Sequence, residues 1–108
     1  RYEYVRGIPM NDVVYLVTEI TEEDALGTNI VKERSETAVF CEILSAGQQE
    51  FLKAATVGFK PQYRVKLWKQ EYSGQSVVRI EGDYYSVYRT FILNEFAELY
   101  LERRVGEQ

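Results

Sequence analysis

The stretch that decides the fold is VVRIEGDYYSVYRTFILNEFAELYLE, residues 77–102. It is rich in β-branched and aromatic residues, which favour strands. Two short breaks interrupt it, Gly82-Asp83 and Asn94-Glu95, and tight two-residue turns of this kind join antiparallel strands. We therefore predict three consecutive strands here, with a type II′ hairpin turn at Gly82-Asp83.

The same strand character extends towards the N-terminus. Residues 62–68, 37–44 and 13–20 each carry apolar side chains at alternate positions, or at nearly every position in the last of these. Six strands in a chain of 108 residues suit a small antiparallel barrel or sandwich, because closure removes exposed sheet edges. The fold class predicted is therefore mainly β.

One short helix is expected at about residues 46–57. Ser45 and Gln48 have the spacing of a capping box, in which the two side chains satisfy backbone N–H groups at the start of a helix. Gly58 is placed to end the helix in a left-handed conformation, and Pro61 prevents it from resuming.

Residues 21–35 fit neither the strand period nor the helix period, and we predict a long mobile loop. Structureless loops of this length are uncommon in small domains and are usually functional. Its cluster Glu22-Glu23-Asp24 lacks the spacing of a calcium-binding loop, so a solvated surface is favoured over a metal site.

Composition excludes several functions. There is no histidine, which removes Ser-His-Asp and Cys-His catalysis, and the single cysteine, Cys41, cannot form an internal disulfide and is expected to be buried. The net charge of −4 argues against tight binding to duplex DNA. No apolar run is long enough to cross a bilayer, and no membrane association or small-molecule ligand is expected. Met10 is the expected natural start, with residues 1–9 an N-terminal extension and residues 10–108 a single domain.

Other candidate sites are weak. No local pattern selects a catalytic pair among the carboxylates Glu42, Glu81, Glu98 and Glu102, so no enzyme activity, metal or cofactor is predicted. Arg89 is placed on the face of Tyr85 and Val87 and is expected to pair with a carboxylate as a structural ion pair. Alternation of aromatic and basic residues over 63–72 leaves open an oligonucleotide-binding barrel, since such barrels stack bases on aromatic side chains.

Four stretches in order carry a resemblance to a known family. They are Val39-Phe40-Cys41-Glu42, then Gln49-Glu50-Phe51-Leu52-Lys53-Ala54-Ala55 with Gly58-Phe59-Lys60-Pro61, then residues 81–90 (EGDYYSVYRT), and finally Glu98-Leu99-Tyr100 with residues 102–106 (ERRVG). In this order and at these spacings the chain resembles the head-closure proteins of long-tailed bacteriophages, also called head–tail joining, adaptor or stopper proteins. The resemblance covers almost the whole chain after Met10.

The resemblance implies a structural part of the phage or prophage head–tail connector, assembled in the bacterial cytoplasm and retained in the virion. It implies a β-barrel that forms a dodecameric ring beneath the portal and adaptor, offers a platform to the tail-completion protein, and lets packaged DNA pass without reading its sequence. We expect a monomer in isolation. A tail-side completion protein of similar fold is the nearest alternative, and the helix between the second and third strands favours the head side.

In members of this family a long loop between the first two strands extends into the channel, and residues 21–35 occupy that place here. The candidate channel-loop residues are Glu22, Glu23, Asp24, Asn29, Lys32 and Arg34. Tyrosine is enriched, with nine in the chain, and aromatic residues and arginine are common at protein interfaces. The candidate interface residues are Tyr72, Tyr84, Tyr88, Tyr100, Arg103 and Arg104.

Overall fold

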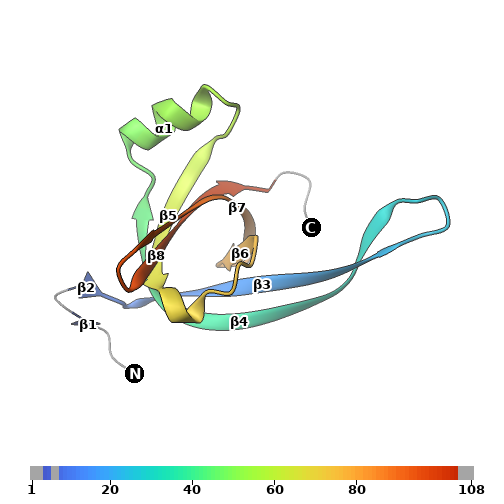
Figure 1. Cartoon of the computed structure of the whole chain (residues 1–108), viewed down its shortest axis with the longest axis horizontal. Coiled ribbons are helices and arrows are strands. Elements are labelled where there is room, and N and C mark those ends of the chain that lie inside the picture. The colour runs from blue at the N-terminus through green and yellow to red at the C-terminus, as the bar shows by residue number, and fades with distance from the viewer. Residues whose placement is uncertain (1–3, 6–7, 105–108) are drawn as a thin grey trace.

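Figure 1 shows the computed structural model, in which curved strands form a ring, a short helix lies on one side, and a two-stranded arm projects from the other. The structure describes residues 4–5 and 8–104, with side chains from Met10 onward. The elements are β1 (Tyr4–Val5), β2 (Ile8–Pro9), β3 (Asp12–Glu23), β4 (Asn29–Ser45), α1 (Gln48–Ala55), β5 (Pro61–Trp68), the 3-10 turn η1 (Lys69–Glu71), β6 (Val77–Ile80), β7 (Asp83–Leu93) and β8 (Phe96–Arg103).

Six of the strands close into an antiparallel barrel in the order β3-β4-β5-β8-β7-β6. The short strand β6 completes the ring, because it pairs with β7 on one side and with residues 15–17 of β3 on the other. The predicted fold class, a small six-stranded antiparallel β structure with one short helix, is confirmed.

The barrel is filled by apolar side chains from alternate positions of its strands. Leu16 on β3, Leu67 on β5 and Leu99 on β8 are at most 1% exposed. Cys41 lies among them, as expected, and burial raises the pKa of its thiol to about 12. The whole cluster comprises Val14, Leu16, Val39, Cys41, Val65, Leu67, Val78, Ile80, Tyr85, Ala97, Leu99 and Leu101.

The predicted loop over residues 21–35 is wrong. β3 continues to Glu23 and β4 begins at Asn29, so these residues form a β-ribbon, the arm, with a turn at 24–28. The register changes between the pairs Ile20↔Glu33 and Thr21↔Val31, which leaves Lys32 as an extra residue. This bulge shifts the alternation by one position, and both faces of the ribbon meet solvent, so no strand period can be recognised in the sequence.

The helix exists, but its start differs from the prediction. Ser45 belongs to β4, and the residue before the helix is Gly47, which has no side chain to make a capping bond. The predicted end is confirmed: Gly58 has φ +92°, its N–H donates to the carbonyl of Ala55 at 3.1 Å, and Phe59 N–H donates to that of Ala54 at 3.0 Å.

The hairpin between β6 and β7 turns one residue earlier than predicted. Glu81 and Gly82 both have positive φ, 51° and 92°, and Ile80 pairs with Asp83. Two positive φ angles define a type I′ turn, so the predicted type II′ turn at Gly82-Asp83 is wrong. The tight turn at Asn94-Glu95 is confirmed, with Asn94 at φ 58°.

Part of the predicted N-terminal extension, residues 1–9, lies outside the described residues. Its described positions form the two-residue strands β1 and β2, which pair with each other. Met10 is fully buried; a natural start there stays a prediction. Within the described ranges, 4–5 and 8–104, no helix has the length and apolar character needed to cross a membrane.

Candidate functional site

The arm ends in a turn that is held by several hydrogen bonds to one residue. Asp24 Oδ1 accepts from the backbone N–H groups of Leu26 and Thr28, both at 2.9 Å. Its own N–H donates to the Thr28 carbonyl at 2.9 Å, and its carbonyl accepts from Gly27 at 3.0 Å. Asp24, predicted as a channel-loop residue, therefore has a structural role in shaping this turn.

The other predicted channel residues are spread along the arm. Glu22 pairs with Lys32 at 3.2 Å across the ribbon, and both side chains are more than half exposed. Glu23 and Asn29 are paired partners in the register next to the turn. Arg34 lies away from the tip, at the base of the arm, where its side chain is 27% exposed. The structure thus places five of the six predicted residues on the distal arm and Arg34 on the barrel side.

Glu19 joins the base of the arm to the end of the chain. Its Oε2 atom accepts from Arg34 Nε at 3.0 Å and from Arg104 Nη1 at 3.2 Å. The Glu19 side chain is only 14% exposed, so both ion pairs are shielded from water. Arg34 also lies over the ring of Tyr84, 4.9 Å from its centroid.

A second carboxylate, Glu36, ties β4 to β6 and β7. Arg79 donates to Glu36 Oε1 from Nε at 3.0 Å and from Nη2 at 2.8 Å, and the Tyr84 hydroxyl approaches Oε2 at 3.4 Å. The hydrogen bonds from Arg79 hold the pKa of Glu36 below its usual value. Arg79 also stacks over Tyr15, 4.3 Å from the ring centroid. The arm base is therefore fixed by charged contacts from three neighbouring segments.

One predicted interface residue, Tyr88, helps to hold the helix against the barrel. The Tyr88 hydroxyl donates to Glu50 Oε2 at 2.7 Å, and Arg89 donates to the other oxygen of the same carboxylate. Phe59 stacks on Tyr88 with ring centroids 4.7 Å apart. Burial and the bond to Glu50 raise the pKa of Tyr88. Tyr88 therefore contributes to the fold in the isolated chain.

The pattern predicts Arg89 on one strand face with Tyr85, Val87 and Phe91, and this is wrong for Tyr85 and Val87. The register changes between the pairs Val87↔Leu101 and Arg89↔Tyr100. The bulge at this point turns Arg89 to the outside, where its guanidinium lies 4.0 Å from the centroid of the Tyr100 ring. Its predicted pairing with a carboxylate is confirmed, and the partner is Glu50.

The remaining predicted interface residues also have partners within the chain. The Tyr72 hydroxyl donates to the Gln75 carbonyl at 2.7 Å, and its ring packs against the barrel core. Tyr100 contacts Glu98 through its hydroxyl at 3.3 Å. Arg103 pairs with Asp83 at 3.0 Å and stays 58% exposed.

Sequence reasoning missed the carboxylates that organise these clusters: Glu19, Glu36 and Glu50. Each is separated from its arginine partner by 15 to 85 positions, so no local spacing reveals them. The one available signal was that Glu19 interrupts an otherwise apolar strand.

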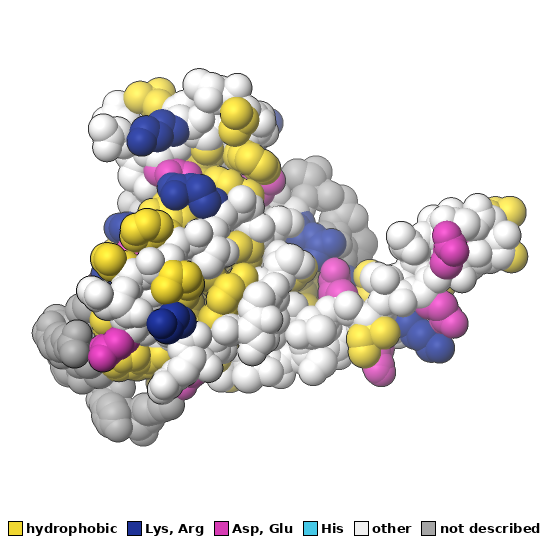
Figure 2. All heavy atoms as spheres, viewed as in Figure 1, with side chains coloured by type: hydrophobic (Ala, Val, Ile, Leu, Met, Phe, Trp, Pro, Cys, Tyr) yellow, Lys and Arg dark blue, Asp and Glu magenta, His cyan; other side chains and the backbone are white. Residues whose placement is uncertain are grey.

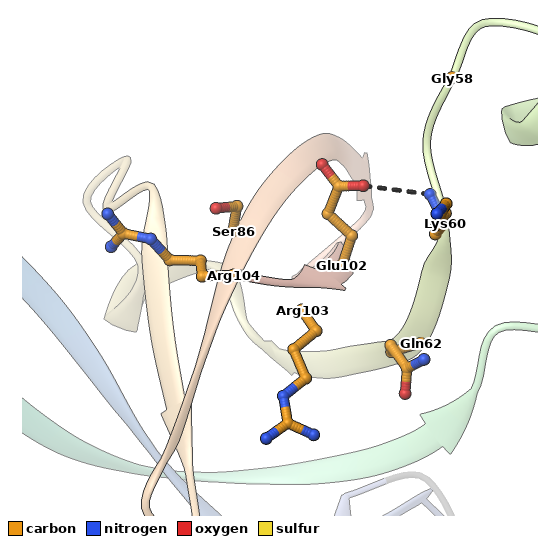
Figure 3. Close-up of a pocket in the computed structure, with 7 residues that line it drawn as sticks. All are labelled: Gly58, Lys60, Gln62, Ser86, Glu102, Arg103 and Arg104. Atoms are coloured by element: carbon orange, nitrogen blue, oxygen red, sulfur yellow. Dashed lines mark hydrogen bonds between the residues drawn. The ribbon is translucent and has the colours of Figure 1, made fainter. Parts of the chain in front are cut away.

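A hollow of about 490 Å³ lies beside the end of β8 and is lined by seven residues (Figure 3). Glu102 Oε1 accepts a hydrogen bond from the backbone N–H of Lys60 at 3.1 Å. In Figure 3 the side chains of Glu102, Arg103 and Arg104 point in different directions. The hollow therefore offers no converging set of groups of the kind that catalysis requires.

Among the carboxylates considered for catalysis, Glu98 is 8% exposed and lies between Arg64 at 3.6 Å and Lys66 at 3.7 Å. This is the environment of a structural ion pair. In the part of the chain that the structure describes, no three carboxylate or cysteine side chains gather as metal ligands.

No protein-family model matches the chain, and a search of curated proteins finds no match.

Proposed function

We propose that this chain is a structural virion protein that closes the DNA-filled head of a long-tailed phage below the portal and adaptor, and that presents the attachment platform for the tail. The observation that carries the proposal is the combination of a closed barrel with a projecting arm whose turn is held by hydrogen bonds. A closure ring needs a rigid scaffold and an element that can reach into the channel, and the four sequence stretches described above resemble those of head-closure proteins.

The arm is the candidate gate. Between Thr21 and Lys32 it carries three carboxylates, Glu22, Glu23 and Asp24, against one cation. An acidic arm repels DNA phosphates, so it would obstruct DNA by occupying space and would not grip it. The hydrogen-bonded turn keeps this obstruction in a defined shape, which a loose loop would not do.

The test uses DNA-filled capsids that carry portal and adaptor, taken from the phage or prophage that encodes the chain. Purified protein is added, ring formation is followed by electron microscopy, and retained DNA is measured after nuclease treatment. We expect an added ring below the adaptor and retained DNA. Binding to isolated tail tubes, without binding to capsids, would replace this proposal with the tail-side alternative.

The gate is tested with a shortened arm. Replacing Thr21–Lys32 by Asn-Gly joins Ile20 directly to its cross-strand partner Glu33 through a favoured two-residue turn, and keeps the contacts of Glu19 and Arg34. We expect this variant to form the ring and lose DNA. A ring that retains DNA without the arm would show that the arm is not the gate.

A further inference from the structure

The arm presents one apolar side chain at its extreme end. Leu26 is 90% exposed, the highest exposure among the exposed large hydrophobic residues, and it sits on the turn that Asp24 holds rigid. Figure 2 shows hydrophobic atoms at the end of the arm with acidic side chains just behind them. A rigid turn that exposes leucine loses little conformational entropy when that leucine is buried by a partner, so the tip has the properties of a docking element.

A matching surface lies on the other side of the barrel. A hollow of about 410 Å³ separates helix α1 from the start of β5, and its lining includes Phe51, Phe59, Pro61 and Lys60. Phe51 is 48% exposed there. Figure 2 shows hydrophobic and basic side chains together on the helix.

The charges of the two surfaces are complementary. Among the described side chains, from Met10 to Arg104, neither Glu23 next to the turn nor Lys60 at the hollow takes part in an ion pair. A carboxylate beside an exposed leucine thus matches an ammonium group beside an apolar hollow.

One chain cannot make this contact with itself. In Figure 1 the arm tip lies far out at one end of the long axis of the molecule, which measures 52 Å, and helix α1 lies on the far side of the barrel from it. The tip can therefore reach only the hollow of a second copy.

We propose that the arm tip of one copy docks on the hollow between α1 and β5 of a second copy, with Leu26 in the hollow and Glu23 against Lys60. The two surfaces differ, so the contact is heterologous and generates a ring or an open chain of copies. The contact involves this chain alone and does not depend on the phage proposal. In a ring, a docked arm would lie against a neighbouring copy, which is a different position from the free arm proposed as the gate.

The test is paramagnetic broadening of NMR signals between two copies of the chain, which detects weak contacts. A nitroxide is attached to Thr28→Cys, an exposed position on the turn, and this chain is mixed with ¹⁵N-labelled wild-type chain; buried Cys41 stays unlabelled. We expect broadening of amide signals at residues 51–62 of the ¹⁵N chain. Broadening elsewhere only, or none at millimolar concentration, would overturn the proposal.

Variants test which residues make the contact, and the affinity of self-association is measured by sedimentation. Leu26→Ser should weaken self-association about tenfold, since it removes one buried leucine. Glu23→Lys and Lys60→Glu should each weaken it, and the two together should restore it. The control is Leu52→Ser. Leu52 is an exposed helix residue (58%) outside the hollow, so this substitution should leave the affinity of self-association unchanged. If the double charge reversal does not restore association, Glu23 and Lys60 do not pair across the contact. If Leu26→Ser associates as tightly as wild type, the docking proposal is refuted.

Discussion

Removing the charge of Glu19 should loosen the arm and destabilise the barrel. In Glu19→Gln, Arg34 and Arg104 both lose a carboxylate whose side chain is 14% exposed and which accepts from them at 3.0 and 3.2 Å. Hydrogen bonds between charged groups contribute about 1.5–3 kcal/mol when shielded, and exposed pairs about 0–1 kcal/mol. Both contacts are partly shielded, and the glutamine amide oxygen can still accept one hydrogen bond. We therefore expect the free energy of unfolding to fall by about 1–2 kcal/mol.

The measurement is thermal unfolding combined with hydrogen exchange. A loss of this size should lower the melting temperature by about 5–10 °C in a domain of this length. Amides at residues 18–22 and 31–36 should exchange faster than in wild type, because the base of the ribbon no longer has its anchor to the C-terminal segment.

Glu22→Gln is the matched control. It makes the same change on the same strand, but Glu22 and Lys32 are 57% and 61% exposed, so the expected loss is below about 0.5 kcal/mol. Equal effects of the two substitutions, or unchanged exchange in Glu19→Gln, would refute the view that Glu19 anchors the arm.

Four further outcomes are expected. Cys41, with a pKa of about 12, should not react with a thiol reagent at pH 8 until the protein unfolds. Because the folded pKa of Glu36 is lowered, its stabilising pairing is present above about pH 4.5 and is lost as pH falls through the folded value; Glu36→Gln should flatten the acid limb of the stability curve. Glu81→Asn should stabilise the protein by about 0.5 kcal/mol in thermal unfolding, since type I′ turns favour Asn-Gly. Leu99→Ala should cost about 2–4 kcal/mol by the same measurement.

The barrel could be predicted because its strands have one buried face. Val39 and Cys41 on β4 lie at alternate positions, as do Ala97 and Leu99 on β8, and burial keeps that alternation regular. Turn residues such as Asn94 mark the strand ends. Local pattern and tertiary burial agree in these segments, so the sequence alone gives the strand ends within the barrel to within one or two residues.

The arm could not be predicted because nothing covers it. With both faces in solvent, no apolar period is required, and the bulge at Lys32 breaks whatever alternation remains. The second bulge had a similar effect on Arg89, which changes face without any signal in the sequence. Contacts such as Glu19 with Arg104 depend on closure of the barrel, which brings distant positions together.

The continuity of β4 has a mechanical consequence. This single strand of 17 residues has a contour length of roughly 55 Å, and it runs from the arm turn through the barrel wall to the residues just before α1. Its ion-paired base, at Arg34 and Glu36, divides the strand into a short arm limb, residues 29–33, and a longer barrel limb, residues 37–45. If the strand moved as one piece about this base, a small displacement of the tip would be accompanied by a larger, opposite displacement at the end of the barrel that carries the helix.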